Sequence, residues 1–103
     1  MKVKTNELIG LALDHAVNQI EECCDDPMTP MFSTSWVQGG PIIEREEIFL
    51  AKSLRGVWTA LMYTPQHEVA AFEDGPTPLI AAMRAFVTSK LGDEVEIPEE
   101  LVK

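Results

Sequence analysis

The stretch "TPLIAAMRAFVTSKLG", Thr77 to Gly92, decides the fold, because both ends of a helix are marked in it. Thr77 is a good N-cap residue, and Pro78 follows at the first helical position, where its missing N–H is not needed. Apolar residues then recur at helical spacing as far as Leu91. Lys90 in the last turn and Gly92 at the C′ position suit a helix end. We therefore expect a helix at 78–91.

A second amphipathic helix is predicted at 6–22. Thr5 can cap its N-terminus, and Glu7 lies in the first turn, where the helix dipole favours an acid. The predicted buried stripe has helical spacing and consists of Leu8, Ile9, Ala12, Leu13, Ala16, Val17 and Ile20. Pro27 and Pro30 disfavour continuation of the helix, so a surface connection should follow.

Between the two helices the sequence is rich in strand-forming residues. We expect strands at 47–54 and 57–63, joined by a turn at Arg55-Gly56. Both faces of 57–63 are apolar, which predicts a central strand covered on each side. A polar loop is expected at 64–77. Val95 and Ile97, near the end of the chain, favour a short edge strand.

These elements predict the α+β class, with a small antiparallel sheet and the two principal helices packed on one face. The 103 residues are expected to form one domain, 1–103, with an acidic tail at about 93–103. Apolar residues make up 46% of the chain, which is enough for a single core without disulfide or metal staples.

The charge of the chain limits its partners. Seventeen acids against eight bases give a net charge of −9, which argues against direct nucleic-acid binding through a basic face and favours a basic partner. No apolar run of about 18 residues occurs, so no membrane span is expected. The N-terminus lacks the uninterrupted apolar region of a signal peptide, and we expect a cytoplasmic protein.

Motifs for catalysis, metals and cofactors are not found in the sequence. Cys23 and Cys24 are adjacent, and neither C-x-x-C nor H-x-x-H spacing occurs. His15 and His67 are expected at the surface. The chain also lacks the glycine-rich phosphate-binding motifs and the G-x-S-x-G motif. We expect no metal, no cofactor and no enzyme activity.

Two glycine–proline segments are the candidate binding site. They are "SWVQGGPIIERE", residues 35–46, and "EDGPTPL", residues 73–79. The candidate residues are Trp36, Gln38, Gly39, Gly40, Glu44, Arg45, Asp74 and Gly75. In the favoured interpretation residues 35–41 are an ordered corner leading into a strand, with the Trp36 ring mostly buried. The alternative is a recognition site with an exposed aromatic surface.

The sequence resembles a known family. The stretches "MKVKTNELIGLALDHAV", "SWVQGGPIIERE" and "GPTPLIAAMRAFVTSKLGDEVEIPEEL" are similar to the NinX-like proteins of lambdoid phages and enteric prophages, a family of unknown function. The resemblance implies a tryptophan at position 15 and an aspartate at position 35. This chain has His15 and Ser35 there instead, so a site built on those two residues would be altered.

The resemblance and the charge together predict a phage accessory protein that binds a host or phage protein. The competing class is a small-ligand-binding protein or enzyme with a site at the two corners, Trp36–Glu44 and Asp74–Thr77. In a variant of the protein-binding hypothesis, the acidic residues at 21–26 and 93–100 mimic the phosphates of a nucleic-acid duplex. An exposed strand edge would offer a route to a homodimer.

Overall fold

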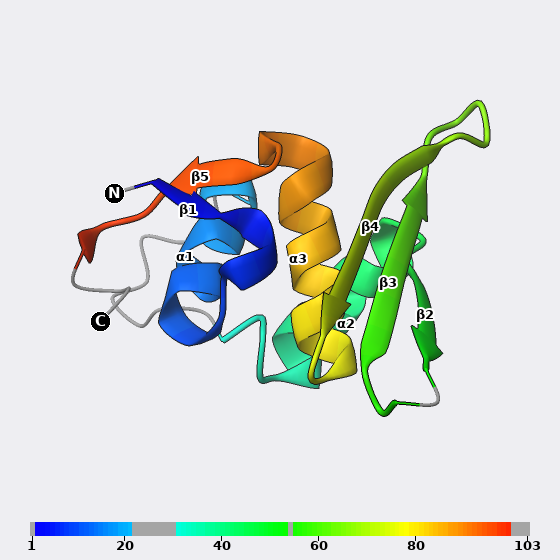
Figure 1. The fold of residues 1–103 in the computed structure, drawn as a ribbon, viewed down its shortest axis with the longest axis horizontal. Helices are drawn as coiled ribbons and strands as arrows, with labels where there is room; N and C mark the ends of the chain where they lie inside the picture. The colour runs from blue at the N-terminus through cyan, green and yellow to red at the C-terminus, as the bar shows by residue number, and fades with distance from the viewer. Residues whose placement is uncertain (1, 22–30, 54, 100–103) are drawn as a thin grey trace.

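The computed structural model describes residues 2–21, 31–53 and 55–99, and Figure 1 shows their arrangement. The helices are α1 (Gly10–Glu21), α2 (Trp36–Arg45) and α3 (Pro78–Leu91), with a short 3-10 turn η1 (Thr5–Glu7). The strands are β1 (Lys2–Lys4), β2 (Phe49–Lys52), β3 (Trp58–Tyr63), β4 (Val69–Gly75) and β5 (Glu94–Glu96). The protein is α+β, as the sequence predicts.

Helix α3 lies at the centre of the molecule, between α1 and the main sheet (Figure 1). Its N-cap is Thr77, whose Oγ1 accepts a hydrogen bond from the Ile80 amide at 3.1 Å. Its last turn contains Lys90, and Gly92 follows with a φ of 91°. The predicted bounds and caps of this helix are confirmed. Most of its side chains are buried, and the ring of Phe86 is among the largest fully buried groups.

The main sheet has the order β2-β3-β4, and both pairs are antiparallel. Leu61 lies opposite Phe49 on one side and Phe72 on the other. Helix α3 covers the face that contains the buried residues Ala60 and Met62. The predicted hairpin is confirmed, and its turn is closed by a 2.8 Å hydrogen bond from the Ser53 amide to the Val57 carbonyl.

Two expectations about the sheet are wrong. The predicted loop at 64–77 contains strand β4, because the backbone of Val69–Gly75 pairs with β3, with one irregularity in register near Tyr63. Strand β3 is central, but only one of its faces is covered by a helix, since Leu61 is half-buried and Tyr63 exposed on the other. The second error comes from the sheet's outer face, which is apolar and yet open.

The first helix begins later than predicted. Gly10 has a φ of 59°, so the chain turns there and α1 runs from Gly10. Thr5 does not cap this helix. It is fully buried, and its hydroxyl donates to the Gly92 carbonyl at 2.7 Å. The predicted end of the helix at residue 22 lies outside the described residues, as do Cys23 and Cys24. Helix α1 packs on α3, on the side away from the sheet.

The N-terminal and C-terminal segments form a second, two-stranded sheet. β1 pairs antiparallel with β5, so that Val3 lies opposite Val95. Val95 and Ile97 are both buried, and the predicted edge strand is confirmed at Glu94–Glu96. Part of the predicted acidic tail is therefore ordered against β1. None of the described helices is long and apolar enough to cross a membrane.

Candidate functional site

Residues 36–45, predicted to be a corner leading into a strand, form helix α2 instead. Glycine and proline have the lowest helix propensities, so local preference does not explain this helix. Contacts with distant parts of the chain explain the helix instead. Gly39 is buried where α2 meets Phe32 and α3, and a Cβ there would lie 2.7 Å from Leu79 Cδ2. Only glycine allows this approach. The prediction of a strand at the end of this segment is wrong.

The Trp36 ring is exposed. It lies in the first turn of α2 with 55% of its surface open to solvent, so the expectation of a mostly buried ring is wrong. Its neighbour Val37 is 85% exposed. The backbone beneath them is held in place, because the Met31 carbonyl accepts from the Ser35 amide at 2.8 Å and Gln38 Oε1 accepts from the Met31 amide. The molecule thus presents an indole on an ordered helix end.

The two predicted corners meet in space. A shallow hollow of about 270 Å³ lies between the start of α2 and the start of α3. Its lining consists of Ser33, Thr34, Trp36, Thr77, Pro78, Leu79 and Ile80. Of the eight candidate residues, only Trp36 is among them. We refer to Trp36, Val37 and this hollow together as the Trp36 surface.

The start of α3 has few free amide groups to offer a ligand. Pro78 has no N–H, the Ile80 amide donates to the Thr77 hydroxyl, and the Ala81 amide donates to the Thr77 carbonyl. An anion at this helix end would therefore compete with the cap. The hollow offers apolar surface and hydroxyl groups, which suit contact with a side chain better than with a phosphate.

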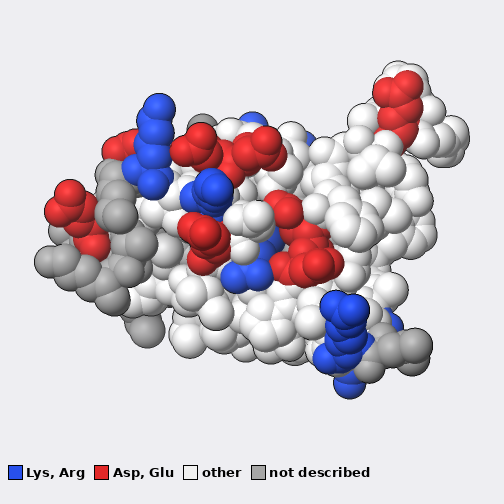
Figure 2. All heavy atoms as spheres, in the orientation of Figure 1, with Lys and Arg blue, Asp and Glu red and all other residues white. Residues whose placement is uncertain are grey.

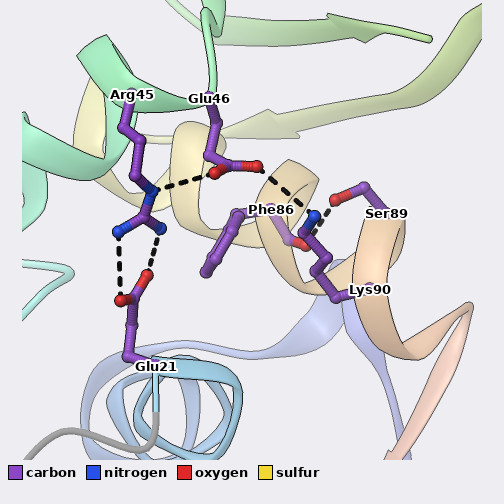
Figure 3. A network of polar contacts seen from close by, with 6 residues as sticks. All are labelled: Glu21, Arg45, Glu46, Phe86, Ser89 and Lys90. Carbon is purple, nitrogen blue, oxygen red and sulfur yellow. Dashed lines mark hydrogen bonds and ion pairs between the residues drawn. The ribbon is translucent and has the colours of Figure 1, made fainter.

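Arg45 lies at the other end of α2 and belongs to a different cluster, shown in Figure 3. Its guanidinium forms a bidentate ion pair with Glu21 of α1 and a second with Glu46, at 2.9 Å. It also lies over the Phe86 ring, 5.8 Å from the centroid. The hydrogen bonds that its guanidinium donates to Glu21 and Glu46 raise the pKa of Arg45. Lys90 approaches Glu46 at 3.5 Å.

This cluster ties the end of α2 to α1 and α3. Arg45 is therefore a structural residue rather than part of the Trp36 surface. Glu44, one residue earlier, is exposed in the last turn of α2 and does not line the hollow. Gly40 does not line the hollow either, although a Cβ there would lie 3.7 Å from Trp36 Cε3.

Asp74 and Gly75 lie at the end of β4 and have structural roles as well. The Asp74 carboxylate accepts from the Thr59 hydroxyl at 2.8 Å, and its carbonyl accepts from Arg84 Nη1 at 2.8 Å. Gly75 is buried where the strand passes α3, and a Cβ there would lie 2.7 Å from the Ala81 amide nitrogen. These contacts fix the approach of β4 to α3.

Arg84 is the most enclosed cation near this strand end. Its Nε donates to the Leu8 carbonyl at 2.8 Å. Burial lowers the pKa of Arg84, and the charges of Glu73 and Asp74 act in the opposite direction. It borders a hollow of about 600 Å³ together with Asn6, Val57, Phe72, Glu73, Asp74, Gly75 and Pro76. Two backbone carbonyls already engage its guanidinium, which leaves it poorly placed to hold a substrate anion.

The described residues contain no group of three or more histidine, cysteine, aspartate or glutamate side chains able to hold a metal. His15 and Gln19 form a hydrogen bond at 3.1 Å on the exposed side of α1. His67 lies in the β3–β4 turn with a φ of 64°. The sequence prediction missed the exposed side chains of Val37, Phe49 and Phe72. Val37 lay in the segment predicted to be a corner, and Phe72 lay in the segment predicted to be a loop.

The fold and this geometry define a small, acidic α+β protein that exposes aromatic side chains on ordered elements. Residues 24–90 of the 103 match the family described as "Bacteriophage P22, NinX". The chain therefore belongs to this phage protein family, as its sequence resemblance predicts. A comparison with curated proteins gives no significant match.

Proposed function

We propose that this phage accessory protein acts by binding another protein, of host or phage origin, through the Trp36 surface. The observation that carries the proposal is the exposed Trp36 ring on a helix end whose backbone is fixed. Tryptophan is enriched among the residues that contribute most to protein–protein binding, because its ring removes a large apolar area from water. Little ordering of the binding surface would be needed on association.

The proposed partner presents a basic surface around an apolar contact. The net charge of −9 attracts such a partner over a Debye length of about 8–10 Å at physiological salt. Charge of this kind mainly accelerates association and sets specificity, while the apolar contact holds the complex. Binding in the cytoplasm of the bacterial host is part of the proposal.

Duplex mimicry is less well supported. Its acids should line one face at phosphate-like spacing, yet the strand pairing sets Glu94 opposite Lys4 and Glu96 opposite Lys2. Glu21 forms an ion pair with Arg45. In both places a basic residue lies beside the acidic one, which weakens the negative electrostatic field that a nucleic-acid mimic needs. The acids at 22, 25, 26 and 100 lie outside the described residues.

The small-ligand alternative retains one observation in its favour, since the two corners do border a common hollow. Its volume of about 270 Å³ is close to the lower end of ligand pockets, which are roughly 300–1,000 Å³ and usually enclose most of the ligand. The hollow is open to solvent, and Trp36 is part of its lining. These features favour insertion of a partner's side chain over capture of a free ligand.

The proposal is tested by affinity capture with the immobilised full chain. Lysates of an enteric bacterial host, with and without phage infection, would be passed over wild type and over Trp36→Ala at low and at high salt. We expect a protein that is retained by wild type at low salt, is reduced at high salt and is lost with Trp36→Ala. The control is Leu91→Ala, a half-exposed apolar residue at the opposite end of α3, which should retain it.

A retained protein becomes evidence only when the purified pair binds in solution and the variant does not. Absence of any Trp36-dependent protein under all four conditions would contradict the proposal. Saturable binding of a small metabolite that quenches Trp36 fluorescence would instead favour the ligand-binding alternative.

A further inference from the structure

The outer face of the main sheet, opposite α3, carries a cluster of exposed apolar side chains. Phe49, Leu61 and Phe72 lie side by side on β2, β3 and β4. Phe49 is 60% exposed and Phe72 is 59% exposed. Tyr63, two residues along β3, packs edge-on against Phe49 with the ring centroids 5.6 Å apart. We refer to these four residues as the outer patch.

The strand alternation shows that the outer patch is not part of the core. Ala60, Met62 and Ala71 point to α3 and are buried, so their neighbours Leu61 and Phe72 point the other way. Aromatic side chains have about 150–250 Å² of surface each, so the exposed parts of the patch with Val57 and Val69 amount to roughly 500 Å². Patches of that size on monomers are often binding sites.

The two ends of the outer patch differ in charge. Glu47 and Glu68 lie at the end where β3 turns into β4, and Arg55 lies at the end where β2 turns into β3. Lys52 alternates to the other face of β2, where its Nζ lies 6.0 Å from the centroid of the Trp58 ring. Figure 2 shows an acidic group at the projecting hairpin tip and basic groups at the opposite end of the sheet, with a second acidic group close to the basic ones. Asp74 adds one carboxylate near the basic end, where the Thr59 hydroxyl donates to it.

A hollow of about 670 Å³ lies at the acidic end of the patch. It is bordered by Glu47, Phe49, Tyr63, Thr64, Pro65 and His67. At the opposite end, Arg55 is exposed beside the short turn that the hydrogen bond from the Ser53 amide to the Val57 carbonyl closes. The face thus has an apolar centre, an acidic hollow at one end and a basic turn at the other.

We infer that the outer patch binds a second copy of this chain, with the two sheets face to face and their strands antiparallel. A two-fold axis that lies in the interface and crosses the strands exchanges the two ends. It places the Arg55 turn of each copy at the Glu47 hollow of the other, while the aromatic centres meet. A two-fold axis along the strands would instead set like charges together, at a cost.

The area supports a weak, reversible dimer. Two copies together would bury about 1,000 Å², at the lower limit for specific interfaces. The net charge of −9 on each copy opposes association, so dissociation constants in the micromolar range are expected. This interface is separate from the Trp36 surface and does not depend on the proposed function.

Sedimentation velocity of the full chain, from roughly 10 to 500 µM, tests the inference. Wild type should pass from monomer to dimer over this range. Phe72→Glu, on the β4 side of the patch, should weaken dimerisation at least about tenfold. The control is Val37→Glu, which puts the same charge on an 85% exposed valine of α2 and should dimerise like wild type. Circular dichroism of each variant checks the fold.

A charge exchange tests the orientation. Glu47→Arg and Arg55→Glu should each weaken the dimer several-fold, and the double variant should recover most of the loss, since the two groups face each other in the proposed arrangement. Wild type that stays monomeric at the highest concentration would overturn the inference. So would a dimer that Phe72→Glu leaves intact, as edge-to-edge pairing of β2 or β4 would give. A double variant weaker than both single ones would overturn the antiparallel arrangement.

Discussion

Gly39 faces the carbonyl oxygen of Phe32 so closely that a Cβ at position 39 would lie 2.4 Å from that oxygen. The next glycine, Gly40, has open space, and its nearest contact would be Trp36 Cε3 at 3.7 Å. Gly39 is therefore the residue that lets α2 pack against Phe32 and Leu79, and through them it fixes the position of the Trp36 surface.

The two glycines should respond differently to alanine. Gly39→Ala forces α2 away from Phe32 and should lower the free energy of unfolding by about 1–3 kcal/mol. Gly40→Ala adds helix propensity and meets no close atom beyond its chain neighbours, but Pro41 disfavours helical angles in a preceding residue that has a Cβ. Since these effects oppose each other, Gly40→Ala should change the free energy of unfolding by less than about 1 kcal/mol. Urea unfolding followed by circular dichroism measures both. Stabilisation by both substitutions would show that α2 does not make this close contact.

Arg45 should contribute more to stability than Arg55. Arg45→Ala removes the ion pairs with Glu21 and Glu46 and the contact with the Phe86 ring, whereas Arg55 is exposed in a turn. Because the Arg45 side chain is 51% exposed, the expected loss is only about 1 kcal/mol.

Part of the stability that Arg45→Ala loses should be absent in high salt, because salt screens the ion pairs. Thermal unfolding of Arg45→Ala and Arg55→Ala at low and high salt makes the comparison. Equal melting temperatures for the two variants would contradict the role assigned to the cluster in Figure 3.

Asp14 should make stability depend on pH. This carboxylate of α1 is buried and accepts from the Ser33 amide at 2.7 Å. Burial raises the pKa of Asp14 above its ordinary value of 3.8, and the contacts with Ser33 offset part of that rise. The folded chain thus takes up this proton at a higher pH than the unfolded chain does, so protonation stabilises the fold.

As the pH falls from neutral through the raised pKa of Asp14 toward 3.8, its contribution to stability should increase. Asp14→Asn keeps the acceptor for Ser33 and should be as stable as wild type or more so at pH 7, with a flatter pH dependence. Asp14→Ala leaves the Ser33 amide without that acceptor and should lose about 1–3 kcal/mol. Chemical denaturation from pH 4.5 to 7.5 would show the difference. Parallel curves for wild type and Asp14→Asn would contradict this assignment.

Elements with complete local signals were predictable. Helix α3 has its cap at Thr77, its proline at the first position and its glycine at the end, and each of these signals acts on its own backbone. The β2–β3 hairpin was predictable for the same reason, since Gly56 supplies the positive φ that its turn requires.

Helix α2 was not predictable, because its stability comes from a distant contact. Gly39, Gly40 and Pro41 all disfavour a helix locally, and only packing on Phe32 and Leu79 reverses that preference. The same helix separates the candidate site residues. The small-ligand alternative requires the two corners to meet, and they border a common hollow, but a helix turns Glu44 and Arg45 away from it.

The central claim is that Trp36 serves recognition rather than the core, and one variant tests it most directly. The affinity of Trp36→Ala for the captured partner, measured by isothermal titration calorimetry beside wild type, should fall by about 30-fold or more, equivalent to about 2 kcal/mol at a binding hot spot. Its melting temperature should stay within a few degrees of wild type, because the ring is 55% exposed. Unchanged affinity, or loss of binding only together with a collapse of the fold, would contradict the claim.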